Sequence, residues 1–86
     1  MSEVQICYFD LGNTRLKLWL CDQHGQLLEA ASVLHEGLLL EVLDKLPETF
    51  GSSPSAILGA SVMSSEHNGH FMAACARKWA QLQRFA

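Results

Sequence analysis

The sequence lacks the features that mark several whole classes of protein. None of its apolar runs approaches the ~20 residues that a membrane-spanning helix needs. Its first three residues, Met1-Ser2-Glu3, lack the basic start of a secretory signal. Only six of the 86 residues are Lys or Arg and they form no stripe, so binding to nucleic acid through its phosphates is not expected. We therefore expect a cytoplasmic protein that binds neither a membrane nor nucleic acid.

Cysteine is also scarce, and histidine does not cluster. The three cysteines contain no CxxC pair, and Cys7 and Cys21 lie in apolar stretches, so buried free thiols are expected. His67 and His70 are three residues apart but lack a third ligand, so a solvated helix end is favoured over a metal site. The apolar fraction of 49% excludes disorder, and the length allows one domain over residues 1–86.

The apolar pattern of the first half predicts an antiparallel meander of three strands. Residues 4–11 are apolar at both alternating sets of positions, which is typical of a central strand covered on both faces. The run ends at Gly12-Asn13, a pair that favours turns, and apolar residues resume at 15–21, so these two strands are expected to form a hairpin. A second turn leads to a third strand at 26–34.

The second half predicts helices and one further strand. Leucine and valine at helical spacing predict a helix over 36–46. Residues 56–63 predict a fourth strand, and Ser64 or Ser65 can cap a helix that continues to about Arg84. The residues of this last helix that are expected in the core are Phe71, Cys75, Trp79 and Leu82.

The resulting order, β-β-β-α-β-α, predicts an α/β fold with a mixed sheet. Three antiparallel strands followed by a crossover to a parallel strand form the start of the ribonuclease-H-like fold of actin-like ATPases. That fold continues with another strand where this sequence ends, so we expect a truncated half-domain. The strand at 56–63 would then expose an unpaired edge, which predicts self-association or a homodimer.

One segment, Phe9-Asp10-Leu11-Gly12-Asn13-Thr14-Arg15-Leu16-Lys17, combines residue types that suit a polyphosphate site. Asp10 can hold Mg²⁺, directly or through water. Gly12 lets phosphate oxygens approach the main chain, and Asn13 and Thr14 add backbone and side-chain donors. Lys17 can neutralise phosphate charge as a compact cation.

Whether these groups form one site depends on the register of the hairpin. With an even number of residues in the loop, Asp10 pairs with Arg15 and Lys17 lies on the same face. A loop of three residues turns Lys17 to the other face. The alternative interpretation is a plain hairpin with an exposed lysine.

The string Asp-x-Gly-Asn-Thr-x-x-Lys at residues 10–17 resembles the first phosphate motif of type III pantothenate kinases and of the related Bvg accessory factors. Ala60-Ser61-Val62-Met63 is similar to that family's fourth strand. The resemblance implies ATP-dependent phosphorylation of pantothenate to 4'-phosphopantothenate, the first step of coenzyme A biosynthesis. It also implies a homodimeric enzyme that uses Mg²⁺ and a monovalent cation, K⁺ or NH₄⁺. The residues implied to contact the ATP phosphates are Asp10, Gly12, Asn13, Thr14 and Lys17, with Asp10 at the metal.

The resemblance also implies what this chain lacks. The family's catalytic aspartate lies in a Gly-x-Asp-Arg string, which is absent, so we expect no catalytic residue here and an N-terminal fragment of the kinase. An alternative is a non-catalytic nucleotide-binding or regulatory module of the Bvg accessory factor type. A ribonuclease-H-type nuclease needs several carboxylates around two metals, including one on the fourth strand, and residues 56–63 contain none.

Overall fold

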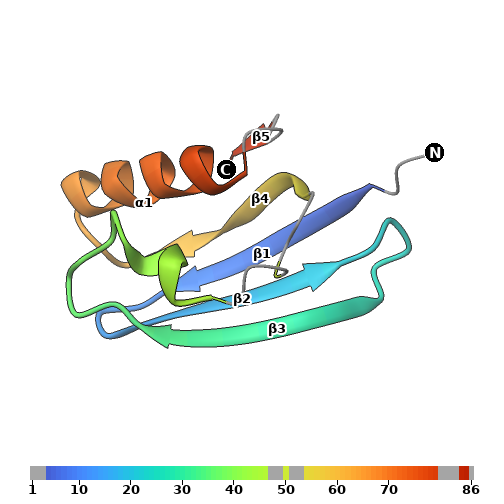
Figure 1. The fold of residues 1–86 in the computed structure, drawn as a ribbon, viewed down its shortest axis with the longest axis horizontal. Helices are drawn as coiled ribbons and strands as arrows, with labels where there is room; N and C mark the ends of the chain where they lie inside the picture. The colour runs from blue at the N-terminus through green and yellow to red at the C-terminus, as the bar shows by residue number, and fades with distance from the viewer. Residues whose placement is uncertain (1–3, 47–49, 51–53, 80–83, 86) are drawn as a thin grey trace.

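In the described part of the chain, a mixed sheet with strand order β3-β2-β1-β4-β5 carries an α-helix on one of its faces (Figure 1). The structure is a computed structural model that describes residues 4–46, 50, 54–79 and 84–85. The elements are β1 (Gln5–Leu11), β2 (Arg15–Cys21), β3 (Leu27–Leu34), the 3-10 helix η1 (Val42–Lys45), β4 (Pro54–Ser61), α1 (Ser65–Lys78) and β5 (Arg84–Phe85). The α/β class and the mixed sheet expected of a ribonuclease-H-like half-domain are confirmed.

Strand β1 is central in the sheet, as expected, but the described residues cover it on one face only. It pairs antiparallel with β2 and parallel with β4. The face beneath α1 and η1 is buried, whereas Tyr8 of β1 and Trp19 of β2 on the opposite face are 41% and 36% exposed. The expectation of cover on both faces is therefore wrong for these residues. The buried side chains of the two strands are Cys7, Phe9, Leu11, Leu16, Leu18 and Leu20.

The helix expected over residues 36–46 is reduced to the four residues of η1. Glu36 and Gly37 both have positive φ, 52° and 80°, so the chain makes a left-handed turn where that helix was expected to begin. The apolar residues of this segment nevertheless lie in the core, because Leu39, Val42 and Leu43 are all buried. The spacing of these residues reflects their contact with the sheet, and this contact does not require an α-helix.

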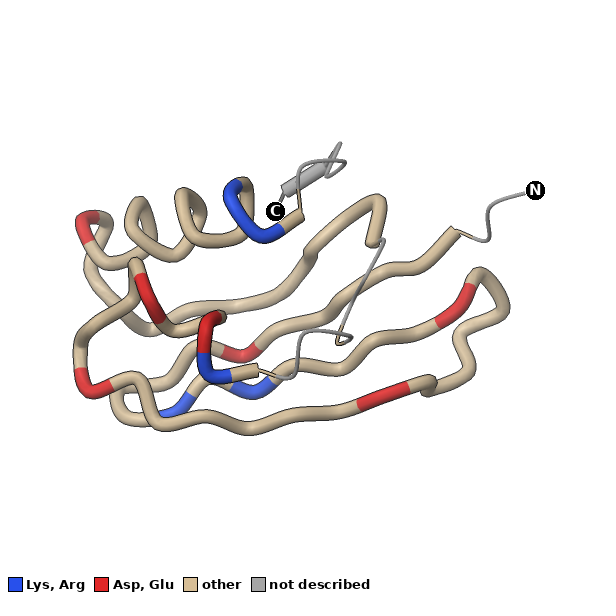
Figure 2. Tube along the Cα trace, viewed as in Figure 1, with Lys and Arg blue, Asp and Glu red and all other residues tan. Residues whose placement is uncertain are grey.

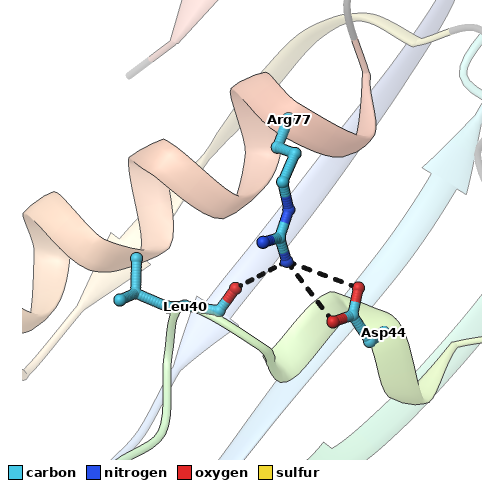
Figure 3. Close-up of polar contacts among 3 residues, drawn as sticks. All are labelled: Leu40, Asp44 and Arg77. Atoms are coloured by element: carbon cyan, nitrogen blue, oxygen red, sulfur yellow. Dashed lines mark hydrogen bonds and ion pairs between the residues drawn. The ribbon is translucent and has the colours of Figure 1, made fainter.

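Arg77, in the last turn of α1, connects that helix to η1 (Figure 3). Its Nη2 donates to the Leu40 carbonyl oxygen at 3.0 Å and lies 3.3 Å from Oδ2 of Asp44. The side chains of Arg77 and Asp44 are 62% and 67% exposed, so this ion pair contributes about 0–1 kcal/mol. The contact positions η1 against the helix more than it stabilises the fold.

Helix α1 begins as the sequence predicts, and it ends earlier. Ser64 is its N-cap and accepts a hydrogen bond from the His67 N–H at 3.3 Å. The helix stops at Lys78, short of the expected Arg84, and the expected core residue Leu82 lies outside the described residues. Phe71, Cys75 and Trp79 are buried as predicted. No helix within the described residues is both long enough and apolar enough to cross a membrane.

Strand β4 has a neighbour on each side along part of its length. The sequence predicted this strand over 56–63 with no fifth strand beside it; it spans Pro54–Ser61, and the two residues of β5 pair with Ala56 and Ile57. The expectation of a missing fifth strand is therefore wrong for the first half of β4. Among the described residues, positions 58–61 pair with β1 only. Association through this edge remains a prediction.

The contact between β1 and β4 depends on the absence of a side chain at Gly59. Phe9 is the register partner of Gly59, and a Cβ at residue 59 would collide with the Phe9 carbonyl oxygen and lie 2.7 Å from its ring. The Phe9 ring also packs on Phe71 of α1, with ring centroids 4.9 Å apart and planes at 56°. This stack joins the sheet to the helix.

Candidate functional site

The candidate site lies at the edge of the sheet where the parallel strands β1 and β4 end. The Val62 N–H donates to the Leu11 carbonyl oxygen at 3.1 Å, so the chain leaving β4 stays beside the end of β1. The β1–β2 turn and the first turn of α1 lie at the same end of the molecule (Figure 1). Open α/β sheets bind ligands outside the carboxyl ends of their strands. The predicted motif is therefore at an edge that can receive a ligand.

The hairpin register brings Asp10 and Lys17 into direct opposition. The Gly12 N–H donates to the Arg15 carbonyl oxygen at 2.9 Å, which leaves two residues, Asn13 and Thr14, in the turn. The loop therefore has an even number of residues, and Lys17 shares the face of Asp10. The expected pairing of Asp10 with Arg15 is wrong, because this tighter turn pairs Asp10 with Lys17. In Figure 2 the acidic position of β1 lies beside the basic positions of β2.

Both charged side chains project from the face of the sheet opposite α1, which carries the exposed Tyr8 and Trp19 and is called the open face below. Both are available to a ligand. Asp10 and Lys17 are exposed, and paired positions place Cβ atoms about 4.5–5.5 Å apart. Within the described part of the chain, neither side chain makes a hydrogen bond or an ion pair. An anion that binds Lys17 would therefore displace no partner among the described residues.

Gly12 is not required by the conformation of the turn. Among the described residues, positive φ occurs only at Gly25, Glu36 and Gly37. A Cβ at Gly12 would meet the Arg15 carbonyl oxygen at 3.5 Å, an ordinary van der Waals contact. A glycine that the chain itself does not need is consistent with close approach of a ligand to the backbone.

The turn residues Asn13 and Thr14 present unused donors. Both are exposed, and neither their N–H groups nor their side chains donate to any residue that the structure describes. The Thr14 carbonyl oxygen, in contrast, accepts from the His35 N–H at 3.1 Å. The turn thus uses the Thr14 carbonyl group for a contact within the protein and leaves the N–H groups of Asn13 and Thr14 to an anion.

Lys17 also borders a hollow on the open face. A shallow pocket of about 320 Å³ is lined by Lys17, Trp19, Ala30, Ala31 and Ser32. Arg15 Nη1 donates to Ser32 Oγ at 3.5 Å along the same margin. This space adjoins the lysine that the sequence assigned to phosphate.

His35 contacts the turn and was not identified from the sequence. It is fully buried, its Nε2 lies 2.7 Å from the Gly12 carbonyl oxygen, and its Nδ1 accepts from the Gly37 N–H at 2.9 Å. The contact joins residues that are 23 positions apart, so no local sequence pattern predicts it.

A hydrogen-bonded group also fixes the β4–α1 connection next to the turn. Ser61 Oγ donates to Asn68 Oδ1 at 2.6 Å and accepts from the Met63 N–H at 3.0 Å. Asn68 Nδ2 donates to the Met63 carbonyl oxygen at 3.5 Å. The sequence signal available for this group was the Ser64 cap, which places Asn68 in the first turn of α1.

The described residues do not form a metal site from protein ligands alone. They contain no group of three or more His, Cys, Asp or Glu side chains that could hold a metal ion. Mg²⁺ is commonly held by one or two carboxylates together with substrate phosphates and water. The single carboxylate of Asp10 fits a Mg²⁺ site of that kind, in which the phosphates of a nucleotide are further ligands.

Comparison with known proteins gives a partial similarity. No protein-family profile matches the chain. The chain is 40% identical over 73 residues to a type III pantothenate kinase from Laribacter hongkongensis (strain HLHK9). The aligned region is 84% of this chain and 28% of that kinase, so the chain spans less than a third of its length.

Proposed function

We propose that this chain is the phosphate-binding portion of a type III pantothenate kinase, which transfers a phosphoryl group from ATP to pantothenate. The observation that carries this proposal is the pairing of Asp10 with Lys17 beside a turn in which the N–H groups of Asn13 and Thr14 donate to none of the described residues. The 40% identity to a kinase of this name supports the choice of reaction. The structure independently supports an anion site at this edge of the sheet.

In the proposed complex, each residue has a separate task. Lys17 neutralises charge on the ATP phosphates, and the N–H groups of Asn13 and Thr14 donate to phosphate oxygens. Gly12 permits close approach of the phosphates to the backbone. Asp10 holds Mg²⁺, directly or through water, and the bound metal supplies further neutralisation of phosphate charge.

The chemical step itself needs groups that these residues do not supply. The Gly-x-Asp-Arg string, which carries the catalytic aspartate by resemblance, is absent from the 86 residues. We assign this chain to phosphate binding and not to deprotonation of pantothenate. The pantothenate pocket, the monovalent cation (K⁺ or NH₄⁺) and a cytoplasmic homodimer belong to the proposed complete enzyme.

Calorimetric titration of the 86-residue chain with ATP tests the proposal. We expect binding that needs Mg²⁺ and is weaker for AMP, because AMP lacks the phosphates that contact Lys17. A coupled assay should show no ADP release with pantothenate. Equal binding of ATP and AMP would contradict a phosphate site. A coding sequence beyond Ala86 without a Gly-x-Asp-Arg string would contradict the kinase.

A further inference from the structure

We infer that His35 is a positioning residue that holds the Gly12–Thr14 turn in the conformation that binds phosphate. It contacts this turn twice, through its backbone N–H to the Thr14 carbonyl oxygen (3.1 Å) and through its ring to the Gly12 carbonyl oxygen (2.7 Å). The two contacts lie on either side of Asn13, which remains exposed. The functional half of this inference rests on the proposed function, and the structural half does not.

The two ring nitrogens of His35 have different roles. Nδ1 accepts from the Gly37 N–H at 2.9 Å, so it carries no proton. The ring proton is therefore on Nε2, which donates to the Gly12 carbonyl oxygen. The neutral ring with both nitrogens bonded can be buried without an unsatisfied polar atom.

The loop after β3 is folded so that the ring reaches the turn. Glu36 and Gly37 take positive φ values, and this conformation returns the Gly37 N–H to the ring of His35. The Leu38 N–H donates to the His35 carbonyl oxygen at 2.8 Å, and Lys45 Nζ donates to the Leu34 carbonyl oxygen. The histidine is thereby held on a closed loop.

These contacts determine which groups of the turn face a ligand. A carbonyl oxygen pointing at a phosphate is repulsive, whereas an N–H group is attractive. By accepting hydrogen bonds from His35, the carbonyl oxygens of Gly12 and Thr14 are directed towards the β3–η1 loop. The N–H groups of Asn13 and Thr14, which donate to none of the residues that the structure describes, are left to phosphate. His35 thus acts on the ligand through the turn without contacting it.

Two substitutions separate the contact with the turn from the local contact with Gly37. In His35→Gln, the side-chain amide can place an N–H near the position of Nε2 and keep the bond to Gly12. In His35→Asn, the shorter side chain can accept from the N–H two residues on, as in an Asx turn, and it cannot reach Gly12. If positioning is the role, glutamine rescues and asparagine does not.

Amide hydrogen exchange tests the structural half. The Gly12 N–H, bonded to the Arg15 carbonyl oxygen, reports on the turn, and the Trp79 N–H, bonded to the Cys75 carbonyl oxygen, reports on a distant helix end. In His35→Asn, exchange should accelerate about tenfold or more at Gly12, a loss of about 1.4 kcal/mol in local stability, and remain unchanged at Trp79. In His35→Gln both rates should stay close to those of the natural protein. Equal acceleration at both amides in either variant would identify a merely structural residue and overturn the inference.

Titration with Mg·ATP tests the functional half on the same samples. We expect His35→Asn to bind at least about tenfold more weakly than the natural chain, and His35→Gln to bind within a few-fold of it. Full affinity in His35→Asn together with a loosened turn would overturn the functional half alone. Absence of Mg·ATP binding by the natural chain would contradict the proposed function, and the exchange rates would still decide whether His35 holds the turn.

Discussion

Asp10 and Lys17 face each other across the β1–β2 ladder, and the next pair along the ladder, Leu11 and Leu16, is fully buried on the opposite face. A shift of one strand by one residue would bury one charged side chain and expose one leucine. The core therefore fixes the register that brings the two charges together.

Removing either charge should weaken nucleotide binding and leave the fold intact. Hydrogen bonds to charged groups contribute about 1.5–3 kcal/mol, so Lys17→Ala and Asp10→Asn should each weaken Mg·ATP binding by roughly 10–100-fold. Thermal unfolding should be unchanged, because both side chains are exposed. Calorimetric titration is the measurement, with Lys78→Ala and Asp44→Asn as controls of matching charge. An unaltered dissociation constant in Lys17→Ala would remove Lys17 from the site.

Alanine at two glycines should separate ligand binding from stability. Gly12→Ala should preserve the unfolding free energy, because φ is not positive and the added Cβ has an ordinary contact at 3.5 Å. It should still reduce Mg·ATP affinity by obstructing the phosphates. Gly59→Ala should destabilise by about 1–3 kcal/mol or more, because its Cβ collides with the Phe9 backbone. Urea unfolding and calorimetry on both variants test this contrast, and an unstable Gly12→Ala variant would contradict it.

Leu43 and Leu40, close together in the segment around η1, should respond differently to truncation. Leu43 is 2% exposed and belongs to the core, whereas Leu40 is 46% exposed. Leu43→Ala should lower the unfolding free energy by about 2–5 kcal/mol. Leu40→Ala should change it by no more than about 0.5 kcal/mol. Chemical denaturation of both variants provides the comparison. Similar losses would mean that η1 does not pack as described.

Stability should fall in mildly alkaline solution because of buried thiols. Burial, assisted by the nearby Cys21, raises the pKa of Cys7 to about 12 from the ordinary value of 9.0, and burial raises the pKa of Cys75 in the same direction. Above pH 9 the unfolded chain loses these protons while the folded chain retains them, so unfolding is favoured as pH rises. Each thiol should lower the unfolding free energy by up to about 1.4 kcal/mol per pH unit between about pH 9 and 12.

Urea unfolding from about pH 8 to pH 10 checks this dependence, and Cys7→Ser supplies the control. The serine variant will be less stable at every pH, because it buries a hydroxyl, but its stability should fall less steeply above the ordinary thiol pKa of 9.0. Equal slopes in the two proteins would show that Cys7 does not titrate with unfolding.

The open face and the partly paired edge of β4 should cause association at high concentration. Leu58 lies on β4 beside Tyr8, in the part of the strand that pairs with β1 only among the described residues. Leu58→Lys should therefore suppress association, and Leu38→Lys, at a leucine that is 59% exposed in a loop, should not. Light scattering over a concentration series measures the mass. A monomer at high micromolar concentration in the natural chain contradicts the prediction.

The strands could be predicted because their signals are local, and the elements set by tertiary contacts could not. β2 was predicted at its observed bounds, and β1 to within one residue, from alternating leucines and a glycine-containing turn. The residues after β3 have a spacing that suits either a helix or a loop packed on the sheet, and the left-handed Glu36-Gly37 turn selects the loop. The end of α1 at Lys78 was not predictable, because no glycine or proline follows it. The strand β5 was not predictable either, because it is defined by its pairing with β4.

The same distinction applies to the candidate site. Asp10, Gly12, Asn13, Thr14 and Lys17 occupy consecutive parts of one hairpin, so their common location followed from the sequence. Their register did not, because it depends on whether the turn closes at Gly12 or at Leu11. His35 and the Ser61–Asn68 pair reach this edge from other elements, and no local pattern encodes such contacts.

The two-residue turn has a consequence for the order of folding. The Asp10–Lys17 pair closes a loop so short that hairpin formation, on a scale of about 1–10 μs, can precede pairing of β1 with β4, whose partners Phe9 and Gly59 are far apart in sequence. Loop-closure entropy also delays the contact between Gly12 and His35. We therefore expect the charge pair to assemble early, and the turn to acquire its final conformation only after β3 and the loop behind it have docked.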